Sequence, residues 1–136
     1  MEVAIRNSAG KVSFAKVPIN FTALLREDGK LEGQQYLQLW RQEISESNEV
    51  LEALQGLPSP DATRHIFERN RIFFVAPAKS QTGKDVSYFS MRSTNGVVIL
   101  MEITFNGDGT GQACVKTQEP SLVPLLLHDV RRVLQS

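Results

Sequence analysis

The chain begins with two short stretches in which apolar and polar residues alternate. Val3 and Ile5 lie in the first stretch, Val12 and Phe14 lie in the second, and the turn-like segment 7–11 separates them. A period of two is typical of strands with one buried face. The pattern therefore predicts strands in this part of the chain.

A helix is predicted next, over residues 31–42, because this segment is rich in helix formers and has no internal proline. At about 100° per residue, its apolar side chains fall within one arc of about 160°, with Trp40 near the middle. The side chains in this arc are Tyr36, Leu37, Leu39, Trp40 and Ile44. The arc favours a core role for Trp40, the only tryptophan, but tryptophan is also enriched at binding hot spots. Both roles stay open.

The rest of the chain alternates between helical and strand-like segments. Loop-like residues surround the apolar segment 50–54, and a short helix is predicted over 59–70, with Ser59 at its N-cap and Pro60 at its first position. Four strands are predicted over 71–76, 85–93, 97–105 and 112–118, followed by a C-terminal amphipathic helix. Pro120 suits its first turn, and Pro124 limits where the regular helix begins. The order predicts an α+β fold, an antiparallel sheet that carries helices on its faces.

The hairpin over residues 85–105 has two possible registers, which place different side chains on the same face. A two-residue turn at Asn95 and Gly96 would put Tyr88 opposite Ile103 and mix polar with apolar residues. A three-residue loop, with Gly96 in a left-handed conformation, buries more apolar surface. Its single apolar face contains Phe89, Met91, Val97, Ile99, Met101 and Ile103. The second register places Tyr88 opposite Glu102 on the other face.

Glu102 is the one charged residue in the apolar strand 97–105. Burying its carboxylate without a partner would cost several kcal/mol, so a cation or water must satisfy it. One interpretation pairs Glu102 with Arg92 or a lysine of this chain. The other is that Glu102 receives an arginine from a binding partner.

Composition excludes several function classes. Fifteen basic and fifteen acidic residues give zero formal charge, which argues against a nucleic-acid partner. The lone Cys114 fits a reducing, cytosolic compartment, and no apolar segment predicts a signal peptide or direct membrane insertion. His65 and His128 lie in no metal or nucleophile motif, and segment 106–111 is best explained as a hairpin connector. No enzyme activity, catalytic residue, cofactor or metal site is predicted.

Several motifs occur in order along most of the chain: "EDGK" before the first helix, Trp40 near its end, "NE" after it, Tyr88, "TNG" in the turn, and Glu102. In these motifs the chain resembles the C-terminal appendage, or ear, of beta-adaptin, the large beta subunit of clathrin adaptor complexes. The resemblance runs from about Val17 to the C-terminus and is to the platform subdomain. Residues 1–17 are similar to the end of the preceding β-sandwich subdomain, so residues 18–136 are expected to form the platform of a longer protein.

The resemblance implies a TBP-like platform, a five-stranded antiparallel sheet flanked by helices on both faces. It implies an interaction module for short helical motifs with spaced phenylalanines and a later arginine. The expected partners are accessory proteins, with clathrin and other adaptor subunits as further partners in the whole protein. The expected location is cytoplasmic, on coated vesicles or on plasma or trans-Golgi membranes.

Carried over by position, the family's peptide-binding residues match Trp40, Arg41, Glu49, Tyr88 and Glu102. The resemblance implies that Trp40 and Tyr88 form aromatic walls, whereas Glu49 and Glu102 receive the arginine or cap the peptide helix. Arg41 stands where lysine is common in the family. Micromolar-scale affinity is expected, with multivalency raising it in a coat.

Two departures from the family bear on peptide specificity. One extra residue lies between Trp40 and Asn48, and Val98 stands where animal members often have a second tryptophan. A different hypothesis is therefore that this platform has lost the peptide site and has a structural or assembly role.

Overall fold

The computed structural model describes residues 2–6, 12–16, 21–43 and 49–135. Ile44, which was predicted on the apolar arc, lies outside these ranges. The strands are β1 (Glu2–Arg6), β2 (Val12–Lys16), β3 (Glu49–Gln55), β4 (Phe73–Lys79), β5 (Asp85–Arg92), β6 (Val98–Phe105) and β7 (Thr110–Thr117). The α-helices are α1 (Gly33–Gln38), α2 (Pro60–Glu68) and α3 (Val123–Leu134). Short helical segments are η1 (Phe21–Leu24), η2 (Leu39–Glu43) and η4 (Pro120–Leu122).

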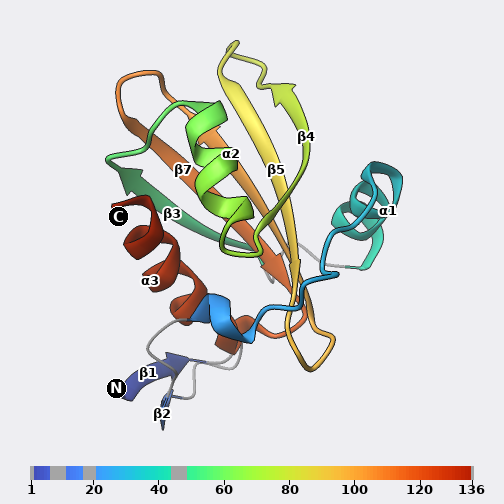
Figure 1. Ribbon diagram of the computed structural model, residues 1–136, viewed down its shortest axis with the longest axis vertical. Coiled ribbons are helices and arrows are strands. Elements are labelled where there is room, and N and C mark those ends of the chain that lie inside the picture. The colour runs from blue at the N-terminus through green and yellow to red at the C-terminus, as the bar shows by residue number, and fades with distance from the viewer. Residues whose placement is uncertain (1, 7–11, 17–20, 44–48, 136) are drawn as a thin grey trace.

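The centre of the fold is a five-stranded antiparallel sheet with the strand order β3-β7-β6-β5-β4. Figure 1 shows α2 and α3 on one side of this sheet and α1 on the other. The predicted α+β class, with helices on both faces, is therefore confirmed. No helix within the described ranges is long and apolar enough to cross a bilayer.

One strand prediction needs correction, and another is confirmed. The apolar segment 50–54 was expected between loops, but it belongs to β3, an edge strand paired with β7. The predicted N-terminal strands are confirmed as β1 and β2, which pair with each other in a separate two-stranded sheet. The fifth strand of the main sheet is thus β3, whose alternating burial exposes every second side chain.

The β5–β6 hairpin has the register that buries one apolar face. Tyr88 lies opposite Glu102, and Gly96 has φ +83° at the end of the loop. The amide of Ser93 donates to the carbonyl of Val97 at 3.0 Å, which closes a three-residue loop of the predicted kind. The hairpin therefore places Tyr88 and Glu102 side by side on the face that carries α1.

Two clusters of buried residues lie on opposite faces of the sheet. The larger cluster packs under α2 and α3 and includes Phe67, Phe89 and Leu126, each 0% exposed. The smaller cluster lies under α1 and is formed by Leu31, Tyr36 and Leu100. Ser59 caps α2 by accepting a hydrogen bond from the Ala62 amide at 3.3 Å, as predicted. The smaller cluster is the one that positions the candidate site.

Asp129 of α3 joins this helix to the segment η1. Its carboxylate is buried, 1% exposed, and accepts from the Thr22 amide at 2.8 Å and from Arg132 Nε at 2.6 Å. We expect Asp129→Ala to lower the free energy of unfolding by about 2 kcal/mol, because hydrogen bonds to buried charged acceptors contribute that much. Urea denaturation would measure the change. The control Asp61→Ala removes an exposed carboxylate from α2, and an equal loss in both variants would contradict the prediction.

Candidate functional site

The helix that carries Trp40 is not a regular α-helix along its whole length. It begins with a capping box between Glu32 and Gln35, is α-helical to Gln38 and continues as a π-helical turn, η2. Tyr36 is 1% exposed, whereas Leu37 is 44% exposed. The prediction that Leu37 faces the core is therefore wrong, because a helix this short covers the sheet with a narrower stripe than the arc of the wheel.

Three aromatic rings meet where this helix lies over the sheet. The ring of Tyr36 stacks on that of Trp40 with centroids 5.9 Å apart, and Tyr88 approaches Tyr36 at 5.6 Å and Trp40 at 6.2 Å. The hydroxyl of Tyr36 donates to the Met101 carbonyl at 2.9 Å, which fixes the deepest ring to β6. Trp40 and Tyr88 are only partly buried, so their rings are both packed and accessible.

Glu102 lies beside these rings, directly opposite Tyr88. The pKa of Tyr88 is raised, chiefly by burial and then by the charge of Glu102 and the hydrogen bond between the two side chains. No ion pair of Glu102 is found within the part of the chain that the structure describes. Arg92 instead lies near Asp28. The interpretation that Glu102 pairs with Arg92 or a lysine is thus not supported.

Glu49 opens β3 and is exposed. The thiol of Cys114 donates to Glu49 Oε1 with a sulfur–oxygen distance of 2.8 Å. Burial raises the pKa of the Cys114 thiol, and Glu49 and Glu102 raise it further. The thiol therefore stays protonated and acts as a hydrogen-bond donor that orients Glu49.

Lys116 of β7 completes the cluster. Its side chain is 7% exposed, and its ammonium lies 4.1 Å from the centroid of the Trp40 ring. Such a cation–π contact contributes about 0.5–2 kcal/mol. Sequence reasoning missed this lysine, although continuing the hairpin register into β7 would have placed Cys114 opposite Glu102 and Lys116 opposite Leu100.

The structure therefore unites most of the five residues predicted from the sequence. Trp40, Tyr88 and Glu102 adjoin one another, and Glu49 joins them through Cys114. Arg41 follows Trp40 in the sequence and is exposed, and no ion pair joins it to Glu49 or Glu102 among the described side chains. Val98 is partly buried and packs in the same cluster. This is the position at which the resemblance implies a second tryptophan in many family members.

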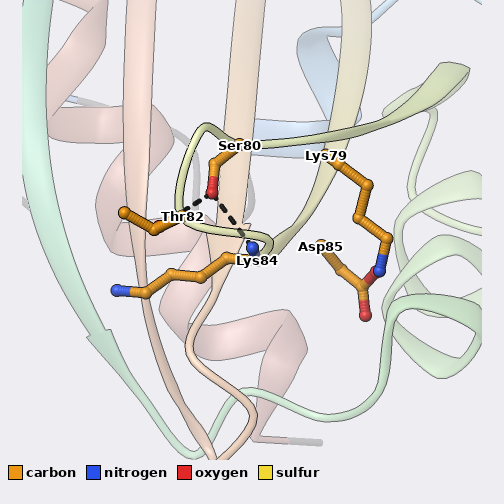
Figure 2. Close-up of polar contacts among 5 residues, drawn as sticks. All are labelled: Lys79, Ser80, Thr82, Lys84 and Asp85. Atoms are coloured by element: carbon orange, nitrogen blue, oxygen red, sulfur yellow. Dashed lines mark hydrogen bonds and ion pairs between the residues drawn. The ribbon is translucent and has the colours of Figure 1, made fainter.

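A separate hollow of about 500 Å³ lies at the end of the sheet formed by the β4–β5 and β6–β7 turns and the start of α2. The charged side chains at this hollow already have partners within the chain. Lys84 Nζ donates to Asn106 at 2.9 Å, and Lys79 pairs with Asp85. Figure 2 shows Ser80 bridging Thr82 and the Lys84 amide, at 3.0 Å each. The two charged side chains that line this hollow, Lys84 and Asp85, thus each have a polar or ionic partner already.

The two histidines do not form a site in the described part of the chain. His65 and His128 are exposed, on α2 and α3, and neither lines the hollow at the turns. No group of three potential metal ligands occurs among the described residues. The aromatic cluster and its carboxylates are therefore the best candidate for a functional site.

Comparison with known proteins gives the family. The model of the beta2-adaptin appendage, C-terminal subdomain, matches residues 26–134. The beta subunit of the AP-1 complex from Dictyostelium discoideum is 28% identical over 126 residues, which are 90% of this chain and 13% of that protein. The AP-1 complex subunit beta-1 from Mus musculus is 30% identical over 105 residues, 76% of this chain and 11% of that protein. The chain spans little more than a tenth of the length of these relatives, and it belongs to the family of beta2-adaptin appendage C-terminal subdomains.

Proposed function

We propose that this chain is the protein-interaction platform of an adaptor large subunit and binds short helical peptide motifs of accessory proteins in clathrin-mediated vesicle transport. The observation that carries the proposal is the meeting of two partly exposed rings, Trp40 and Tyr88, with the carboxylate of Glu102. Aromatic anchors and a nearby charge are what an amphipathic peptide helix needs from a groove.

In this proposal the phenylalanines of the peptide pack against Trp40 and Tyr88. The arginine of the peptide reaches Glu102, which has no internal ion pair among the described residues. Glu49 is the second carboxylate of the site, because it accepts a hydrogen bond from Cys114, the residue opposite Glu102 on β7. Hydrogen bonds between a guanidinium and a carboxylate are among the stronger ones in proteins. The two carboxylates thus give the site a preference for a cationic ligand.

The cellular setting is part of the same proposal. The AP-1 beta subunits among the relatives are subunits of a complex by name, and we propose that the whole protein acts on the cytoplasmic side of coated vesicles. Its partners there would be accessory proteins, clathrin and other adaptor subunits. Because one such site binds with roughly micromolar affinity, several linked sites in a coat would be needed for stable attachment.

The test is titration of a Phe-x-x-Phe-x-x-x-Arg peptide into the protein by isothermal calorimetry. We expect Trp40→Ala and Tyr88→Ala each to weaken binding by about tenfold or more, since aromatic anchors dominate such interfaces.

Phe74→Ala is a matched control. Phe74 is also a partly buried aromatic residue with a cation above it, because the guanidinium of Arg64 lies 4.2 Å from its ring centroid. It packs with the cluster under α2 and α3, on the opposite face. Binding by the control with wild-type affinity is expected. Undetectable binding by the wild type, or equal affinities for all four proteins, would reject the site.

A further inference from the structure

Lys116 is the least expected residue of the site, because a lysine is rarely this buried without an ionic partner. Only 7% of its surface is exposed, and its ammonium lies over the indole of Trp40. Its neighbours across the ladder are Leu100 on β6 and Glu49 on β3. No ion pair or hydrogen bond of its ammonium is found among the side chains that the structure describes. The contact that the structure shows for the Lys116 ammonium is thus the face of the Trp40 indole.

Lys116 also belongs to a charge cluster centred on Cys114. Glu49 and Glu102 both act on the Cys114 thiol and raise its pKa, although burial has the larger effect, and Lys116 acts on the same thiol in the opposite direction. Two negative charges and one positive charge therefore surround one buried atom. The ammonium of Lys116 cancels part of the field that the two carboxylates present to the surface.

We propose that Lys116 is a specificity-determining residue of this site, an internal cation that covers part of the Trp40 ring and reduces the preference of the carboxylates for a cationic ligand. This inference rests on the proposed function. A guanidinium that approaches Glu49 and Glu102 meets a repulsive ammonium as well as two attractive carboxylates, and it also competes with that ammonium for the indole face. The chain's own lysine thus sets how strongly an arginine is recognised.

The experiment compares two peptides and three proteins. The peptides share one Phe-x-x-Phe-x-x-x-Arg sequence and differ only at its last position, which is arginine in one and the neutral isostere citrulline in the other. The proteins are the wild type, Lys116→Met, which keeps the length of the side chain without its charge, and Lys116→Arg, which keeps the charge. The measured quantity is the ratio of the two affinities, because a uniform structural change alters both affinities and leaves their ratio unchanged.

We expect the arginine-to-citrulline ratio to rise by about threefold to tenfold in Lys116→Met, as the loss of one nearby like charge implies. Lys116→Arg is expected to keep the wild-type ratio. Because Trp40 is the only tryptophan, its fluorescence before peptide is added should also change in Lys116→Met. Circular dichroism checks that the variants fold, and Lys116→Gln replaces Lys116→Met if the latter does not.

The outcomes separate this inference from the proposed function. Binding of both peptides with an unchanged or lower ratio in the uncharged variants would overturn the role of Lys116 and leave the peptide site intact. Failure of every protein to bind either peptide would overturn the proposed function and the role of Lys116 with it.

Discussion

Replacing Phe89 with alanine is expected to lower the free energy of unfolding by about 3–5 kcal/mol, the range for large aromatic residues cut back inside a core. Phe89 is 0% exposed, and its ring meets Phe67 at 4.9 Å and Phe74 at 5.9 Å between centroids, both edge to face. It lies on β5, next to the middle strand of the sheet, and packs under α2 and α3. The loss therefore combines apolar burial, ring contacts and a cavity that the rigid sheet cannot close.

Chemical denaturation followed by circular dichroism measures this loss. Leu51→Ala is the matched control, because Leu51 lies on β3 of the same sheet but is 58% exposed. Its truncation is expected to cost less than about 1 kcal/mol, as for most surface substitutions. Comparable losses in the two variants would mean that the sheet does not bury the face assigned to it.

The buried face of the β5–β6 hairpin was predictable from the sequence because only one register collects its apolar residues. A shift of one residue reverses the face of every side chain, and only the three-residue loop keeps the apolar residues of both strands on one face, as the structure does. The pairing of Tyr88 with Glu102 is a consequence of that choice. Half of the candidate site was thus available from local sequence pattern alone.

The strand β3 was harder to recognise. It lies at the edge of the sheet, and only Leu54 among its residues is buried. Glu52 interrupts the apolar run within β3, and it forms an ion pair with Arg131 of α3, a partner distant in sequence. An apolar segment this short, with a charge in its middle, carries little strand signal of its own. Its pairing with β7 depends on the complete sheet.

The remaining parts of the site depend on contacts between distant segments. Cys114 meets Glu49 and Lys116 meets Trp40 only because β7 lies between β3 and β6. The sequence offers no periodic signal for either contact. The helical wheel misplaced Leu37 because α1 is short and covers the sheet with a narrower stripe than the arc of the wheel.

Tyr36 links the stability of the fold to the shape of the candidate site. Replacing it with alanine is expected to lower the free energy of unfolding by about 3–5 kcal/mol, because Tyr36 is 1% exposed and packs with Leu31 and Leu100 in the cluster under α1. The same change removes the ring on which Trp40 stacks. Peptide binding should therefore weaken together with stability, and Trp40 fluorescence should shift to longer wavelength as the indole gains contact with water.

Tyr36→Phe separates these two roles. It keeps the ring and removes only the hydroxyl that donates to the Met101 carbonyl, so a loss of about 1 kcal/mol is expected, as for a typical hydrogen bond. Because the stacking surface remains, Trp40 emission and peptide affinity should stay close to those of the wild type. If Tyr36→Phe instead weakened binding as much as Tyr36→Ala, the hydroxyl rather than the ring would position Trp40. Normal binding by a folded Tyr36→Ala protein would show that the π-helical turn holds Trp40 without support from beneath.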